Sequence, residues 1–137
     1  LANYMLGGFG DVWGAPLTFE RMAGWVFAPI AWCLGIPWGE AVDAGQLLGI
    51  KFIVNEVVAY LHQAALPHDA LSDRTDLIML YALCGFANFS SVGITIAGVT
   101  VLAPNRRKEI VQLAQRSLIS GTLSSLLVGA TIGLMPY

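Results

Sequence analysis

The uncharged stretch Leu77–Asn105, LIMLYALCGFANFSSVGITIAGVTVLAPN, decides the fold that we predict for this chain. It is longer than the roughly 20 apolar residues that a helix needs to cross the hydrocarbon core of a bilayer. Gly85, Asn88 and Ser91 stand near its centre, and these residue types interrupt helices. The pattern favours a discontinuous transmembrane helix over 76–103, with an unwound polar centre, rather than a straight helix with its polar groups turned inward.

The composition of the whole chain points to the same environment. Its 137 residues are 56% hydrophobic and 12% charged, with a mean hydropathy of +0.68, whereas soluble domains carry about 25% charged residues. So few charges cannot cover the surface of a soluble domain of this size. The net charge of −2 and the lack of a long basic run exclude a nucleic-acid partner. We therefore expect an all-α membrane protein with the lipid bilayer as its main solvent.

Two further elements are predicted between residue 18 and the long apolar stretch. Residues 18–36 begin at a capping Thr18 and carry tryptophans, so we expect an interfacial helix there. Residues 41–64 are apolar but interrupted by charge, and both of their ends adjoin acidic residues. We expect them to form a re-entrant helical hairpin with its tip near Asn55 and Glu56, buried in protein or facing a wet cavity.

The end of the chain is expected to hold a final transmembrane helix over 107–135. Basic residues cluster just before and within its first turns, which places that connection on the cytoplasmic side of the membrane. Small residues recur at every fourth position from Ser117 to Gly133, and this spacing is typical of tight helix packing. We expect residues 1–17 to be a connecting segment and the whole chain to be a piece of a longer membrane protein.

Glu56 is the most informative single residue of the sequence. A carboxylate at membrane depth costs several kcal/mol, and such groups usually mark a route for a substrate or an ion. The structural alternative is an interfacial Glu56 paired with Lys51. Asn55 either orients the carboxylate or caps one arm of the hairpin, and Lys51 either pairs with Glu56 or extends its ammonium toward the membrane surface. We predict that Glu56 binds substrate and that Asn55 and Lys51 support it.

A second polar cluster lies in the long apolar stretch, where Asn88 and Ser91 follow Phe86. The two polar residues either cap the ends of the broken helix or hydrogen-bond a hydroxylated ligand at the helix break. Together with Glu56 they offer a carboxylate, an amide, a hydroxyl and an aromatic face, which suits a sugar with adjacent hydroxyls. The residue types alone indicate only a polar, uncharged ligand.

Other reactive side chains do not form a recognisable site in the sequence. We expect His62 and His68 to be exposed loop residues, because they lack the spacing of metal ligands. Cys33 and Cys84 lie in apolar surroundings and are expected to be small buried hydrophobes. No nucleophile elbow or phosphate-binding loop is present in the sequence. We therefore predict no catalytic residue, no bound metal and no cofactor.

Two motifs resemble signatures of the concentrative nucleoside transporter family. Residues 49–59, GIKFIVNEVVA, are similar to that family's G-x-K-x3-N-E-F-V-A signature, with Val57 in place of the usual Phe. Residues 82–94, ALCGFANFSSVGI, resemble its second signature nearly residue for residue. The resemblance extends over about residues 18 to 134. It identifies the chain as similar to the C-terminal half of such a transporter.

The resemblance implies a homotrimeric secondary transporter of the plasma (inner) membrane that imports nucleosides with sodium or a proton as the coupling ion. Each protomer would hold two inverted repeats, of which this chain resembles the second. By this resemblance, Glu56, Asn88 and Ser91 bind the ribose hydroxyls and Phe86 lies against the nucleoside. The base-reading residues belong to the first repeat. The function expected from the sequence is therefore nucleoside–cation symport, with the ribose-binding half of the site in this chain.

Two other classes of function stay open on the residues alone. An intramembrane enzyme acting on a small polar substrate would use Glu56, Ser91 or His62, although no base stands beside a nucleophile in a known motif. A ligand-free assembly subunit would use the polar residues only to cap helices. We expect accumulation of an unchanged nucleoside, not formation of a product, to distinguish transport from the first alternative.

Overall fold

Helices account for most of the residues that the structure describes. The computed structural model describes residues 11–12, 15–16 and 18–136. From residue 18 onward the order is α2 (Phe19–Cys33), α3 (Ala41–Ile53), α4 (Glu56–Ala65), α5 (Asp73–Leu83), α6 (Phe89–Leu102), the 3₁₀ turn η2 (Pro104–Arg106) and α7 (Arg107–Gly133). The predicted all-α class is confirmed for this part of the chain.

The segment 1–17, predicted as a connection, lies mostly outside the described residues. Its described residues form two short antiparallel strands, β1 (Asp11–Val12) and β2 (Ala15–Pro16). No helix is predicted for this segment, and its paired residues lie before α2. A pair this short adds no layer to the fold.

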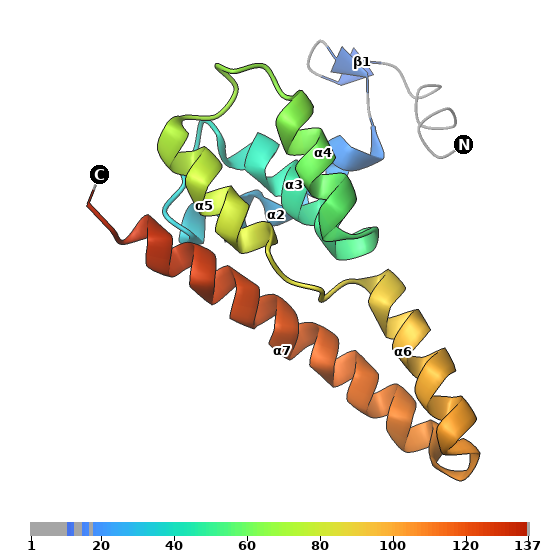
Figure 1. Ribbon diagram of the computed structural model, residues 1–137. Helices are drawn as coiled ribbons and strands as arrows, with labels where there is room; N and C mark the ends of the chain where they lie inside the picture. Colours follow the sequence, from blue (N-terminus) through green and yellow to red (C-terminus); the bar gives the residue numbers. More distant parts are fainter. Residues whose placement is uncertain (1–10, 13–14, 17, 137) are drawn as a thin grey trace.

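The helices form a compact group with a long helical pair extending from it (Figure 1). Helices α2 to α5 gather at one end of the molecule, and α6 leads away from them. Helix α7 then runs back beside α6, and the C-terminal part of α7 packs against α5. This path places the interruption between α5 and α6 where the compact group meets the extended pair.

The core lies between α2, α3 and α5, where apolar side chains are removed from water. Its largest members, each less than 2% exposed, are Ile36, Leu47, Ile78, Met79 and Leu83. Helices α2 and α3 approach each other closely because glycines face their contact. A Cβ atom on Gly45 would lie 2.5 Å from the carbonyl oxygen of Gly24. The close contact fixes α3, which carries the first arm of the predicted hairpin.

Helices α3 and α4 are joined by only two residues, Val54 and Asn55. The Oδ1 atom of Asn55 accepts a hydrogen bond from the backbone N–H of Val58 at 2.9 Å and so caps α4. Of the two roles predicted for Asn55, the structure contains the cap. Glu56 consequently belongs to the first turn of α4 and not to the connection, because the cap starts the helix directly after Asn55.

The long apolar stretch is divided into α5 and α6, with residues 84–88 between them. The polar centre predicted from the sequence extended to Ser91, but Phe89, Ser90 and Ser91 form the first turn of α6. The reason is a capping box, in which the side chains of Asn88 and Ser91 each accept a hydrogen bond from the other's backbone N–H. Because of this cap, α6 begins at Phe89, three residues before the start that the sequence pattern indicated.

Small residues of α7 let it approach α5. A Cβ atom on Gly129 would lie 2.7 Å from the Cβ atom of Ala82, and one on Gly133 would collide with the carbonyl oxygen of Leu34. The spacing of small residues therefore serves packing within this chain. Among the described residues, none of the helices is both long enough and apolar enough to cross a membrane.

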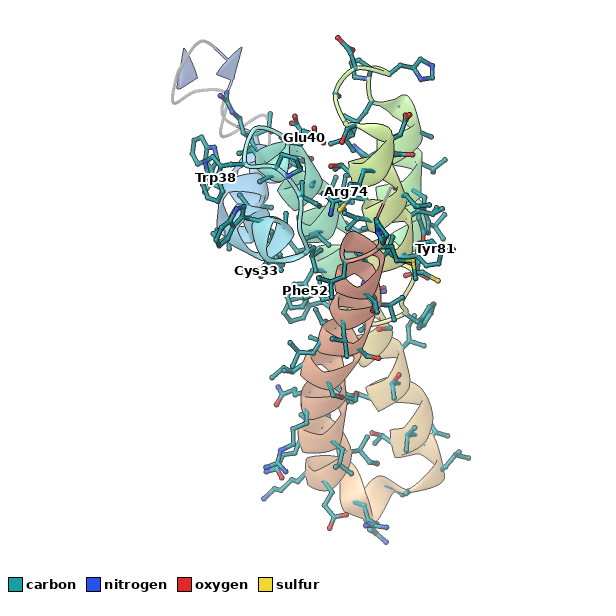
Figure 2. The ribbon with its side chains drawn as sticks, turned by 90° about the vertical axis from the view of Figure 1, so that its left-hand side faces the viewer. Cys33, Trp38, Glu40, Phe52, Arg74 and Tyr81 are labelled. Carbon is teal, nitrogen blue, oxygen red and sulfur yellow. The ribbon has the colours of Figure 1, made fainter. Side chains whose placement is uncertain are left out.

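Polar side chains tie the loops of the compact group to α5 and α7. Ser72 donates hydrogen bonds from its backbone N–H and its hydroxyl to Oε2 of Glu40, at 3.1 and 3.0 Å. Arg74 donates to the carbonyl oxygens of Gly35 and Gly133, and Gly35 has a positive φ of 92°. Figure 2 shows Arg74 beside the C-terminal end of α7. The Arg74 cation thereby lies at the negative end of α7.

Both cysteines are exposed and free, so the prediction of two buried thiols is wrong. Cys33 ends α2, and Cys84 follows α5, where in each case the chain leaves the packed part of a helix. Cys33 and the exposed Trp38 lie on the same outer side of the compact group (Figure 2). The local apolar sequence indicated burial, but the position at a helix end decides exposure.

Candidate functional site

Two helix N-termini converge on one carboxylate in the middle of the molecule. Glu56 is the first residue of α4, and Asn88 caps α6. The amide nitrogen Nδ2 of Asn88 donates a hydrogen bond to Oε2 of Glu56 at 3.2 Å. The N-terminus of a helix carries partial positive charge, which favours a nearby anion. The carboxylate of Glu56 is thus stabilised by its own helix, by α6 and by a direct hydrogen bond.

The helix cap determines which way the Asn88 amide faces. Its Oδ1 atom accepts a hydrogen bond from the backbone N–H of Ser91 at 2.7 Å, and its own backbone N–H donates to Oγ of Ser91 at 3.2 Å. With the oxygen committed to the cap, the Nδ2 group is directed to Glu56. Asn88 is only 1% exposed, so this orientation is held by burial as well. Of the two roles predicted for Asn88, the structure contains the helix cap, and the same side chain also bonds Glu56.

The site keeps unused capacity for hydrogen bonds. The second carboxylate oxygen of Glu56, Oε1, accepts no hydrogen bond within the described part of the chain. The hydroxyl of Ser91 donates to the carbonyl oxygen of Phe86 or Asn88, each at 2.8 Å, and accepts one bond from the Asn88 backbone. A hydroxyl has two lone pairs, so the Ser91 hydroxyl can accept one more hydrogen bond. These groups can accept hydrogen bonds from hydroxyls of a ligand, and the Asn88 amide can donate one.

Aromatic side chains surround the two helix starts. Phe86 lies in the interruption and is 71% exposed, so its ring faces outward from the packed part of the chain. Phe52, near the end of α3, forms edge contacts with Phe89 at 5.0 Å between ring centroids and a tilted contact with Phe27 at 5.7 Å. Figure 2 shows Phe52 where the compact group meets the extended pair. The Phe52 ring therefore joins the hairpin to the start of α6.

Lys51 takes neither of the two places predicted for it. Its Nζ atom donates to the carbonyl oxygen of Ala82 at 2.8 Å and to Oγ of Ser125 at 2.5 Å, and the residue is 2% exposed. Within the described ranges of the chain, Lys51 and Glu56 do not form an ion pair. The physical reason is space, because Gly85 has no side chain that would fill the position beside Ser125. The ammonium therefore points inward, toward α5 and α7.

Ser125 and the carbonyl of Ala82 are members of this cluster that sequence reasoning missed. Ser125 was seen only as part of the small-residue spacing in α7, which indicates packing and not polar contact. A buried lysine needs hydrogen-bond acceptors on neighbouring helices. This requirement is the sequence signal that could have indicated a polar partner for Lys51. It does not say which of the serines in α7 supplies the acceptor.

The remaining polar groups lie away from Glu56. His62 and His68 are both exposed, which agrees with the prediction. The prediction that His62 is a loop residue is wrong, because His62 belongs to the last turn of α4. A cavity of about 340 Å³ lies between the C-terminal end of α4 and the start of α5, and neither Glu56 nor Asn88 lines it. In the part of the chain that the structure describes, no three His, Cys, Asp or Glu side chains are grouped so that they could hold a metal ion.

Comparison with known proteins places this arrangement in a family. Residues 1–133 match the family model described as "Na+ dependent nucleoside transporter C-terminus". The uncharacterized transporter YutK of Bacillus subtilis (strain 168) is 41% identical over 98% of this chain and 33% of its own length. The putative nucleoside permease NupX of Escherichia coli (strain K12) is 41% identical over 85% of this chain and 28% of its own length.

A solved structure agrees with these sequence matches. The structure of CNTnw in an inward-facing substrate-bound state superposes with a TM-score of 0.86 at 39% identity, over 96% of this chain and 33% of that one. The chain spans about a third of the length of these relatives. Because the family model matches nearly the whole sequence, this chain belongs to the family of Na⁺-dependent nucleoside transporters and corresponds to their C-terminal region.

Proposed function

We propose that this chain forms the sugar-binding part of a nucleoside–sodium symporter. In this proposal Glu56 and Asn88 grip adjacent ribose hydroxyls, and the transporter carries the nucleoside together with the ion. The observation that carries the proposal is the hydrogen bond of 3.2 Å between the Asn88 amide and the Glu56 carboxylate. It joins an acceptor and a donor at the distance that two neighbouring hydroxyls of one sugar can bridge.

The charges around this pair support a neutral ligand with hydroxyl groups. A carboxylate accepts hydrogen bonds but cannot donate them, so it selects hydroxyl or N–H groups and repels anions. The N-termini of α4 and α6 carry partial positive charge, which is favourable beside the carboxylate of Glu56. A phosphorylated sugar would bring a second negative charge to this carboxylate, and we therefore propose nucleosides rather than nucleotides as substrates.

Ser91 and Phe86 complete the proposed sugar side of the site. The remaining lone pair of the Ser91 hydroxyl accepts a hydrogen bond from a ribose hydroxyl, while its other hydrogen bonds maintain the cap of α6. The exposed ring of Phe86 offers an apolar face for the nucleoside. Asn55 holds the start of α4, and so holds Glu56, through its bond to Val58. The groups that read the nucleobase belong to another part of the transporter.

The rest of the proposal concerns the whole transporter. We propose that it lies in the plasma (inner) membrane and assembles as a homotrimer. In it, α3 and α4 form a re-entrant hairpin, and α5 and α6 are the two halves of a discontinuous helix. Sodium is the proposed coupling ion, in line with the description of the matching family model. The closely spaced turns at 54–55 and 84–88 are the non-helical segments that transporters place at a substrate site.

Uptake of labelled uridine by proteoliposomes that hold the full-length protein containing this chain tests the proposal. We expect accumulation of unchanged uridine that needs an inward sodium gradient and stops when sodium is replaced by choline. Uridine monophosphate should not compete. Uptake that ignores the sodium gradient would contradict sodium coupling, and conversion of uridine to another compound would support an enzyme instead.

A further inference from the structure

Lys51 lies where two helix C-termini converge. It belongs to the last turn of α3, and its Nζ atom donates at 2.8 Å to the carbonyl oxygen of Ala82, in the last turn of α5. The free carbonyls at the end of a helix carry partial negative charge, which a cation stabilises. Since the side chain is only 2% exposed, its charge is separated from water and depends on such partners.

Ser125 of α7 supplies the second partner of this ammonium. Its Oγ atom accepts from Lys51 at 2.5 Å and donates to the carbonyl oxygen of Thr122 at 3.0 Å, so its lone pair is directed to Lys51. A Cβ atom on Gly85 would lie 3.3 Å from Oγ of Ser125 and 3.4 Å from Nζ of Lys51. The side chains of Lys51 and Ser125 thus occupy the space beside the interruption and join α3 to both α5 and α7.

The hairpin and the interrupted helix are therefore held together by two opposite charges. Two helix N-termini meet at the carboxylate of Glu56, and two helix C-termini meet at the ammonium of Lys51. The two charged residues flank the short connection between α3 and α4. A displacement of α3 from α5 would carry the start of α4 with it, and Glu56 would then move away from Asn88.

We propose that Lys51 is a positioning residue for the sugar site. Its bonds to Ala82 and Ser125 fix the end of α3 and thereby the distance between Glu56 and Asn88. This inference rests on the proposed function of the Glu56–Asn88 pair, but it assigns to Lys51 a role that acts through Glu56 and not by contact with the ligand. It follows that weakening the bonds of Lys51 to Ala82 and Ser125 reduces the preference of the site for ribose over 3′-deoxyribose. The amount of folded protein is not the only quantity that changes.

The test compares binding of uridine and of 3′-deoxyuridine to the detergent-solubilised full-length protein. In Lys51→Met the Kd for uridine should rise about 10- to 100-fold, because the loss of an ordered hydrogen bond to a charged group has that effect on binding. The ratio of the Kd for 3′-deoxyuridine to the Kd for uridine should fall toward one, since Glu56 no longer meets the 3′-hydroxyl of uridine. A lysine that only stabilises the fold would lower the amount of active protein and leave this ratio unchanged.

Two milder variants keep the test decisive if Lys51→Met does not assemble. Ser125→Ala removes one acceptor and keeps the charge, and Gly85→Ala crowds the space between Lys51 and Ser125. Both should shift the ratio in the same direction by a smaller factor. Lys108→Met, at an exposed lysine, and Gly39→Ala, where a Cβ atom meets nothing within 4 Å, are the matched controls and should behave as the wild type.

The outcomes separate this inference from the proposed function. If the wild-type protein does not bind uridine more tightly than 3′-deoxyuridine, the proposed sugar site itself is wrong. If the wild type discriminates, while Lys51→Met, Ser125→Ala and Gly85→Ala all keep both the wild-type Kd and the wild-type ratio, Lys51 has no positioning role. A shifted ratio in these variants, with unchanged controls, is the result that the structure leads us to expect.

Discussion

Asn88 and Glu56, 32 positions apart in the sequence, meet through a hydrogen bond of 3.2 Å between Nδ2 and Oε2. Each residue stands at the start of a helix, and each helix start is fixed by an asparagine side chain that bonds a backbone N–H. The pair therefore connects the turn between α3 and α4 to the turn between α5 and α6. A ligand that binds to both residues binds to both turns at once.

Replacing Asn88 with Ser separates the two roles of this residue. Serine is as good an N-cap as asparagine, so α6 and the melting temperature should change little. The amide that bonds Glu56 is lost, and the Kd for uridine should rise about 10- to 100-fold, the factor expected for a hydrogen bond to a charged group. Titration calorimetry and thermal unfolding of the same preparation measure both effects. Asn105→Ser, at an exposed asparagine, is the control. Unaltered uridine binding in Asn88→Ser would show that Asn88 only caps the helix.

The sugar hydroxyls should account for much of the binding free energy. In competition with labelled uridine, 3′-deoxyuridine should require a concentration about 10 to 100 times higher, because the carboxylate then lacks its hydroxyl partner. The difference between the two compounds should nearly disappear in Glu56→Gln. Equal competition by both compounds against the wild-type protein would argue against hydroxyl recognition by this chain.

The packing of α7 on α5 should be sensitive to one methyl group. A Cβ atom on Gly129 would lie 2.7 Å from the Cβ atom of Ala82 and 3.2 Å from its Cα atom. Gly129→Ala should therefore lower the free energy of unfolding by about 1–3 kcal/mol, the usual effect of overpacking. Gly98→Ala is the matched control in a helix, since its Cβ atom meets nothing within 4 Å, and it should stabilise the protein by up to about 1 kcal/mol. Equal melting temperatures for both variants would be inconsistent with this packing.

The loop before α3 should respond to acid. Partial burial alone would raise the pKa of the Glu40 carboxyl, but hydrogen bonds from Thr75 and from the backbone and side chain of Ser72 lower this pKa below its ordinary value. A carboxyl with a lowered pKa stabilises the folded state above the ordinary pKa of glutamate, about 4.3. That contribution is lost as the pH falls through the lower, folded pKa. The melting temperature of Glu40→Gln should therefore lie below that of the wild type at pH 7, and the gap should close in acid. A gap that stays constant from pH 7 to pH 3 would contradict this assignment.

The sequence was informative where a backbone pattern determines structure. Gly85 and Asn88 indicated the break in the long apolar stretch, and Thr18 indicated the start of α2, because caps and glycines act locally. The predicted break is longer than the observed one, because the mutual hydrogen bonds of Asn88 and Ser91 start α6 at Phe89. Local signals thus gave the order of the helices, but not the residue at which α6 begins.

Contacts between distant segments were the part that the sequence could not specify. Lys51 had two plausible places, and the structure gives it a third, because its partner Ser125 lies 74 positions away on α7. Glu56 and Asn88 were placed together only on the strength of their chemistry and of a resemblance. Exposure of Cys84 was missed because an apolar neighbourhood in sequence does not tell on which side of a helix end a thiol lies.

Binding of uridine to Glu56→Gln is the most direct test of the central claim, that this carboxylate holds the sugar. Glutamine keeps the size of the side chain and removes its charge and one acceptor. Titration calorimetry of the detergent-solubilised full-length protein, with Glu109→Gln at an exposed position as the control, gives the two dissociation constants. We predict that Glu56→Gln folds like the wild type and binds uridine at least about tenfold more weakly. Wild-type affinity in a folded Glu56→Gln protein would contradict the account.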